Sequence, residues 1–244
     1  MSRRNRLFKE MGLGPVWKLR DRPEAAEALP LPPVSGLALS VDPIPQDQSL
    51  RATSITNMDW PALITAVAGC RDCTLGATRK QAVLGVGDLQ ADWLFVGEGP
   101  GAEEDERGEP FVGQAGKLLD AMLAAIDLKR GEGVYIANAV KCRPPGNRTP
   151  EPDEVAACRS FLVRQIELIR PRLIVALGRP AAQTLLQKEV KITGARGRVY
   201  ECQGIPVIVT YHPAYLLRKP EDKAKAWEDL VLARRTMAEI KAGA

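Results

Sequence analysis

The chain of 244 residues has no long apolar run. Nothing in it approaches the roughly 18 consecutive apolar residues of a bilayer span. The Arg-rich start MSRRNRLFKEMG also lacks the apolar stretch of a secretory signal. We therefore expect a cytoplasmic protein in a reducing compartment, with no membrane partner.

Excess charge is nearly absent outside the start of the chain. The formal net charge is +4, and residues 1–22 alone hold seven Lys or Arg against two acids. Overall charge therefore does not identify a partner for the remainder. Six prolines follow between residues 23 and 45, so we predict a flexible, basic and Pro-rich extension over residues 1–57 and a folded domain over residues 58–244.

The pattern of the folded domain predicts an α/β fold. Short apolar runs alternate with helical stretches, which is typical of a mainly parallel central sheet covered by helices on both faces. The expected strands cover residues 93–96, 134–140, 173–177 and 207–211. The expected helices cover residues 115–126, 152–169, 179–186 and 224–240.

Polar residues follow three of the expected strands. The first strand runs into the turn Gly97-Glu98-Gly99-Pro100-Gly101, the second carries Asn138, and the last leads to His212. Ligands of open parallel sheets bind outside the carboxyl ends of the strands. A lone histidine is more often structural than catalytic, but this position favours a site for His212, and an Asn amide suits the edge of a nucleobase.

The same glycine-rich turn formally satisfies a dinucleotide-binding pattern. Glu103, Glu104 and Asp105 follow at once, and their carboxylates would repel a pyrophosphate. We therefore expect no nucleotide cofactor, and infer that the glycines let the backbone approach a flat, neutral ligand.

Four of the five cysteines have the spacing of a metal site. Cys70 and Cys73 form one close pair, while Cys142 and Cys158 lie 16 residues apart. In a reducing compartment such a set favours metal ligation over disulfides. One close pair with two distant cysteines favours an iron–sulfur cluster, and zinc stays open on the pattern alone.

Basic residues gather in loops near these features, which favours a surface that contacts phosphates. They are Lys141, Arg143 and Arg148, then Arg196 and Arg198, then Arg218 and Lys219.

Four long motifs resemble the family 4 uracil-DNA glycosylases, the iron–sulfur branch of that superfamily. They are CRDCTLGATR, GEGPGAEEDERGEPFVGQAGKLLD, YIANAVKCRPPGNRTPEPDEVAAC and TYHPAYLLR, between about residues 59 and 230. The resemblance implies a three-layer α/β/α fold and a monomeric, monofunctional enzyme that hydrolyses the N-glycosidic bond of uracil in DNA. It also implies a structural [4Fe–4S] cluster on Cys70, Cys73, Cys142 and Cys158.

The resemblance also implies roles for residues around the flipped base. Glu98, Gly99 and Pro100 would touch the uracil, Phe111 would stack on it, Glu104 would help exclude the thymine methyl, Asn138 would read its edge, and His212 would hydrogen-bond O2 as charge develops. Leu216 would fill the gap left in the stack. Arg218 would contact phosphate, as the loop residues Arg143 and Arg148 are also expected to do.

Two questions stay open at this stage. The best-known branch of the superfamily has a water-positioning aspartate where this chain has Gly99, so either Glu98 or Glu104 is a candidate to orient water. A non-catalytic, cluster-stabilised nucleic-acid-binding module of the same fold is the alternative to a glycosylase.

Overall fold

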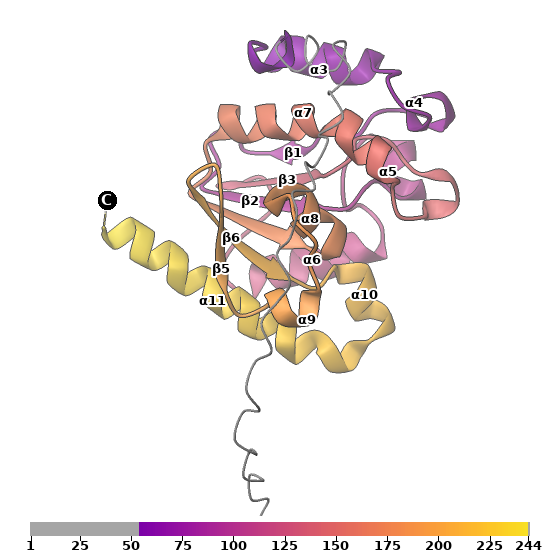
Figure 1. Cartoon of the computed structure of the whole chain (residues 1–244). Helices are drawn as coiled ribbons and strands as arrows, with labels where there is room; N and C mark the ends of the chain where they lie inside the picture. The colour runs from indigo at the N-terminus through magenta and orange to yellow at the C-terminus, as the bar shows by residue number, and fades with distance from the viewer. Residues whose placement is uncertain (1–53, 244) are drawn as a thin grey trace, which may run out of the picture. The chain divides into compact units, whose positions relative to one another are not determined.

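A six-stranded sheet forms the centre of the computed structural model, which describes residues 54–243 (Figure 1). The strands are β1 (Val86–Gly87), β2 (Trp93–Gly97), β3 (Val134–Asn138), β4 (Leu173–Leu177), β5 (Val199–Cys202) and β6 (Ile205–Thr210). Their order across the sheet is β1-β3-β2-β4-β6-β5. The four central strands run parallel and the two edge strands antiparallel, which confirms the mainly parallel sheet.

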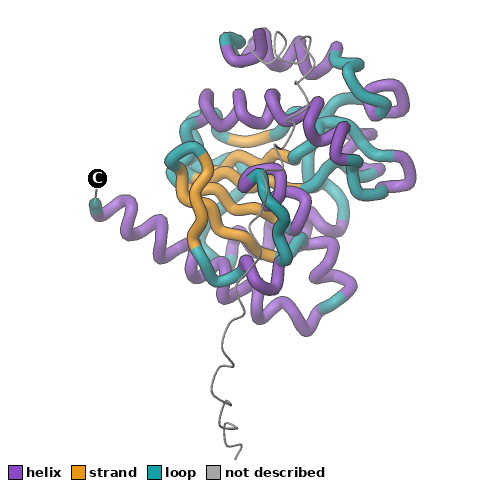
Figure 2. Tube along the Cα trace, viewed as in Figure 1, coloured by secondary structure: helices purple, strands orange, loops and turns teal. Residues whose placement is uncertain are grey.

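Helices cover both faces of the sheet, so the central strands carry apolar side chains on both sides. Along β2, Trp93 and Phe95 point into one core, and Leu94 and Val96 point into the other. Helices α6 (Gln114–Ala124), α10 (Pro213–Arg218) and α11 (Lys223–Ala242) cover the first core, while α7 (Pro152–Ile169) and α8 (Arg179–Leu186) cover the second. Figure 2 shows the strands enclosed between these helices, so the three-layer α/β/α fold is confirmed.

A further pair of helices lies outside α7. In Figure 1, α3 (Trp60–Gly69) lies across the outer side of α7, and α4 (Leu75–Thr78) follows it. A third apolar cluster joins them to α7 and contains Leu63, Val67, Cys142, Cys158 and Phe161. The segment that carries Cys70 and Cys73 is therefore packed against the helix that carries Cys158.

Helix α7 illustrates how local sequence sets an element's ends. Glu151 is its N-cap, Pro152 occupies the first turn, and Glu154 accepts the backbone N–H of Glu151 at 2.7 Å in a capping box. The helix ends at Ile169, and its C-cap Arg170 has a left-handed φ of 53°. Proline and acids at the start predicted this helix with its observed bounds.

The other expected elements agree closely with the structure. The strand expected over residues 134–140 ends earlier, at Asn138, and the last strand covers Ile205–Thr210. Short elements without a long periodic pattern escaped prediction; they are β1, α3, α4, α5 (Ala102–Arg107), α9 (Ile192–Ala195), α10 and the 3₁₀ turns η1 (Pro145–Asn147) and η2 (Pro220–Asp222).

The predicted extension over residues 1–57 lies almost wholly outside the described residues, so it stays a prediction. Within residues 54–243, no helix combines the length and apolar character needed to cross a bilayer.

Candidate active site

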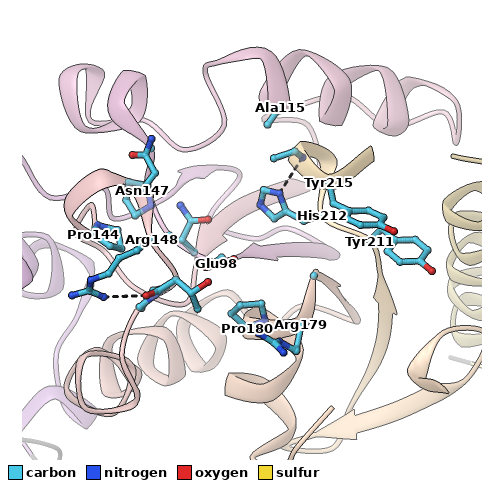
Figure 3. Close-up of a pocket in the computed structure, with 18 of the residues that line it drawn as sticks. Glu98, Ala115, Pro144, Asn147, Arg148, Arg179, Pro180, Tyr211, His212 and Tyr215 are labelled. Atoms are coloured by element: carbon cyan, nitrogen blue, oxygen red, sulfur yellow. Dashed lines mark hydrogen bonds between the residues drawn. The ribbon is translucent and has the colours of Figure 1, made fainter. Parts of the chain in front are cut away.

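A cavity of about 650 Å³ opens at the carboxyl end of the parallel strands. The residues that follow β2, β3, β4 and β6 all contribute to its wall, including Glu98, Asn138, Arg179 and His212. Figure 3 shows His212 and Glu98 near the middle of this cavity, with Arg148 and Arg179 further out. The predicted convergence of polar strand ends is thus found in one place.

The turn after β2 needs glycine at its first position. A Cβ on Gly97 would lie 2.4 Å from Oδ1 of Asn138 and 2.6 Å from Cζ of Phe111. The carbonyls of Gly97 and Glu98 accept the N–H groups of Ala139 and Val140 at 2.9 and 3.2 Å. The turn is therefore fixed to the segment that follows Asn138.

Asn138 presents a buried acceptor without a partner. Its side chain is 2% exposed, and among the described residues nothing donates a hydrogen bond to its Oδ1. Buried polar atoms are nearly always hydrogen-bonded, so an unmatched acceptor on a cavity wall favours a ligand with an N–H or O–H at that point.

Phe111 and His212 form a pair of rings on the cavity wall. Their centroids are 5.4 Å apart with an interplanar angle of 29°. Phe111 has a φ of 56°, a conformation that a bulky residue adopts only when its surroundings impose it. Arg130 holds it there by donating to the carbonyls of Pro110 and Phe111 at 2.9 and 2.8 Å.

His212 is a neutral donor in this setting. Burial is the main cause that lowers its pKa to about 4, and the charge of Arg218 lowers it further while Glu104 opposes the shift. The N–H of Ala214 donates to Nδ1 at 3.1 Å, the dashed bond to the imidazole in Figure 3. Because Nδ1 accepts, the single proton of the neutral ring is on Nε2.

The two candidate carboxylates have different surroundings. Glu104 accepts N–H groups from Gly101, Val112 and Gly113 at 3.0 to 3.2 Å, so it braces the loop around Phe111. Glu98 carries no such set of amide bonds among residues 54–243. Burial raises its pKa, while a hydrogen bond from Thr149 and the charge of Arg179 lower it. Glu98 is thus the carboxylate available to a ligand.

The arginines predicted to contact phosphate differ in the hydrogen bonds that they form within the protein. Arg218 and Arg148 line the cavity. Arg148 donates to both carboxylate oxygens of Glu154 at 2.8 and 2.7 Å, and Arg143 donates to Asn147 at 2.8 Å. Arg148 therefore fixes its own loop.

The structure corrects the expectation for Leu216. Its side chain is 1% exposed and belongs to the core between α6, α10 and α11, whereas a residue that fills a gap in DNA must reach solvent. Leu217, the next residue on α10, is 44% exposed. The helical phase of α10 turns Leu216 inward and Leu217 outward, so Leu217 is the leucine of this helix that faces solvent.

Sequence reasoning missed other residues of the cavity. Arg179 begins α8 directly after β4, and Tyr211 and Tyr215 form a stacked pair with centroids 5.0 Å apart. Arg179 could have been found from its place after a strand end. The bracing role of Arg130 depends on a loop conformation that the sequence does not reveal.

Four cysteines surround a second, much smaller cavity. Cys70, Cys73, Cys142 and Cys158 line a space of about 10 Å³, and the five cysteines, all within the described residues, form no disulfide. Arg79 donates to Sγ of Cys142 at 2.8 Å, and the backbone N–H of Lys141 donates to Sγ of Cys158 at 3.3 Å. Two cationic residues thus accompany the sulfurs.

The donor set around this second cavity is four cysteine sulfurs, the ligand set that a [4Fe–4S] cluster takes. Within residues 54–243, no group of three or more His, Cys, Asp or Glu side chains is arranged to hold a metal ion. Burial raises the pKa of Cys158 to about 12, hence its thiolate requires a positive partner such as a metal centre.

Comparisons with known proteins identify the family of the chain. The model of the uracil DNA glycosylase superfamily matches residues 84–231. The chain is 48% identical to a type-4 uracil-DNA glycosylase of Archaeoglobus fulgidus, over 65% of this chain and 83% of that protein. It is 49% identical to one of Thermotoga maritima over the same shares, and 42% identical to one of Pyrobaculum aerophilum over 72% and 93%.

Proposed function

Because the chain belongs to the uracil-DNA glycosylase superfamily, and within it to the type-4 enzymes, we propose that it is a monofunctional enzyme that removes uracil from DNA. It hydrolyses the N-glycosidic bond and leaves an abasic site for base excision repair. The observation that carries this proposal is the unmatched Oδ1 of Asn138 beside the rings of Phe111 and His212.

The amide of Asn138 suits uracil and mismatches cytosine. Oδ1 accepts the N3–H of uracil, and the amide nitrogen donates to O4. Cytosine presents a bare N3 acceptor and an amino donor at the same edge, so both contacts would be repulsive. Leaving buried polar groups unpaired discriminates strongly between substrates.

The rings and the turn hold the base while its bond to deoxyribose breaks. Phe111 offers a face for stacking, and the turn through Glu98, Gly99 and Pro100 approaches the flat base closely. The Nε2–H of His212 donates to O2, where negative charge develops as the base leaves. A preorganised donor of this kind contributes roughly 3–4 kcal/mol to the transition state.

Glu98 and Glu104 have different roles in the proposed reaction. Glu98 lines the cavity and, among the described residues, is not held by a set of backbone amides, so we assign it to the water that attacks the sugar. Glu104 braces the Phe111 loop through three backbone amides, and its fixed position on the cavity wall suits exclusion of the thymine methyl.

The protein's other contacts serve DNA and the cofactor. Arg218, Arg143 and Arg148 face the backbone of uracil-containing DNA, and Leu217 fills the gap left by the flipped base. When bound to Cys70, Cys73, Cys142 and Cys158, a [4Fe–4S] cluster supplies a covalent crosslink between distant segments. We assign the enzyme no nucleotide cofactor, and we propose that it acts as a monomer in the cytoplasm.

Glu154 connects the segment that carries Cys73 to the loop that carries Arg148. This buried carboxylate accepts the hydroxyl of Thr74, next to Cys73, at 2.9 Å, and the guanidinium of Arg148 at 2.7 Å. Thr74 belongs to the cysteine segment, and Arg148 lines the large cavity. Ordering the first segment therefore supports the second.

Excision from an oligonucleotide with one uracil tests the function. Anaerobically purified protein should leave alkali-sensitive sites at uracil only, without lyase cleavage. Asn138→Ala should reduce the single-turnover rate by about 100- to 1,000-fold, with DNA affinity changed only a few-fold. Thr193→Ala is the control, since Thr193 is an exposed polar residue that lines the same cavity. Equal rates for the two variants would contradict the assignment of Asn138.

A further inference from the structure

Lys141 is a buried cation between the two sites. It is 1% exposed, its Nζ donates to the backbone carbonyl of Asn138 at 2.8 Å, and it also lines the cysteine cavity. Its backbone N–H donates to Sγ of Cys158. Within the part of the chain that the structure describes, Lys141 forms no ion pair with a carboxylate.

A buried ammonium requires a counter-charge. Burying an unpaired charge is among the largest penalties in folding, and the groups whose negative charge would act on Lys141 are Cys158 and Cys142, which line the same small cavity. Their thiolates, bound to a cluster, would supply it. Lys141 therefore marks a site built to hold an anionic centre.

Arg79 is the second cation at these sulfurs. Besides the contact with Cys142, its guanidinium donates to the carbonyls of Val67 and Cys70 at 3.2 and 3.0 Å. Four thiolates around an oxidised [4Fe–4S] core leave a net charge of about −2. Arg79 and Lys141 each place one positive charge beside these sulfurs, and the charge of Arg71 also acts on Cys142.

The segment after β3 joins the cysteine cavity to the large one. Cys142 follows Asn138 by four residues, and the intervening Ala139 and Val140 are bonded to the turn after β2. The bond from Lys141 to the carbonyl of Asn138 closes this segment into a tight loop. A shift at the cysteines would thus move the amide that reads uracil.

Building on the cluster and the function proposed above, we propose that Lys141 is a positioning residue: its ammonium balances the charge of the cysteine-bound centre and, through its bond to the Asn138 carbonyl, ties that centre to the base-reading amide. Arg79 shares only the first of these roles, since within residues 54–243 its guanidinium bonds to Cys142 and to the carbonyls around Cys70, and not to Asn138.

Two uncharged substitutions of Lys141 distinguish its charge-balancing role from its positioning role. Lys141→Met removes both the charge and the donor, whereas Lys141→Gln removes the charge and keeps an N–H for the carbonyl of Asn138. Iron and sulfide per chain, the cluster's reduction potential, and kcat and KM on uracil DNA are measured for each anaerobically purified protein. Arg79→Gln serves as the comparison for the potential, because it removes the other cation.

We expect all three variants to have a more negative reduction potential than the unmodified protein, since a lost cation disfavours the reduced, more negative centre. Lys141→Met should lower kcat by about ten- to a hundredfold through misplacement of Asn138, with KM changed little. Lys141→Gln should restore most of that kcat. A wild-type potential in both Lys141 variants would overturn the charge-balancing role, and a wild-type kcat in Lys141→Met would overturn the positioning role.

Iron, sulfide and excision measurements on the unmodified protein distinguish a failure of the cluster from a failure of the proposed glycosylase function. Protein without iron and sulfide would refute the cluster and the charge-balancing role together, and protein with iron but no excision would refute the glycosylase function alone. If both neutral variants lose their iron, Lys141→Arg decides the point: retained iron supports the need for a charge, and its loss overturns it.

Discussion

The protonation state of the His212 imidazole can be tested by NMR. The chain has one histidine, so its imidazole signals in an NMR spectrum need no assignment by mutation. Burial and Arg218 lower the pKa of His212 from 6.5 to about 4. Between pH 8 and pH 5 its ring signals should therefore barely shift.

The same pKa predicts how stability depends on pH. Because the folded pKa lies below the unfolded one, the unfolded chain binds the proton first, and stability is lost as pH falls from about 6.5 toward 4. A difference of about 2.5 pKa units corresponds to about 3 kcal/mol between pH 7 and pH 4. Replacement by Gln should remove this contribution.

Urea unfolding of the protein and of His212→Gln at pH 7, 5.5 and 4.5 measures that contribution, since the other titrating groups cancel in the difference. Excision rates over the same range should show no loss with a midpoint near the ordinary histidine pKa. An imidazole titration centred near pH 6.5 would refute the neutral ring and the donor role assigned to Nε2.

Two further predictions concern the leucines of α10 and the ion pair of Glu154 with Arg148. Leu217→Ala should leave stability within about 0.5 kcal/mol but slow excision from duplex DNA by roughly tenfold, with little effect on single strands, because only a duplex needs a wedge. Leu216→Ala should instead destabilise the fold by about 2–5 kcal/mol; the reverse pattern in the two variants would restore Leu216 as the wedge. Glu154→Gln should cost about 1–3 kcal/mol of unfolding free energy at pH 7. Because Arg148 lowers the pKa of Glu154 to about 2, the difference in melting temperature should shrink as pH falls from 4.5 toward 2, and a constant difference would argue against the ion pair.

The sequence predicted the long elements because their signals are local. The short apolar run of β2 and the proline and acids at the start of α7 are readable without tertiary information. Helix α10 has only six residues, too few for a periodic pattern. Its phase decides which of Leu216 and Leu217 is buried, and that phase depends on packing against α6.

The site was predictable as a set of residue positions, and its chemistry was not. Strand ends placed Asn138 and His212 in one cavity, as expected for a parallel sheet. The roles of Glu104 and Lys141 depend on partners that the chain brings close only on folding. Glu104 is taken up by backbone amides eight and nine residues away, and the burial of Lys141 follows from the third apolar cluster.

The outer position of α3 and α4 has a consequence for how the protein matures. The segment with Cys70 and Cys73 leaves the ribosome first, but Arg79 and Thr74 find their partners at separations of 63 and 80 residues. Leu63 and Val67 therefore stay uncovered until α7 has been synthesised. The first cysteine pair can therefore meet Cys142 and Cys158 only after the chain beyond Cys158 has been synthesised.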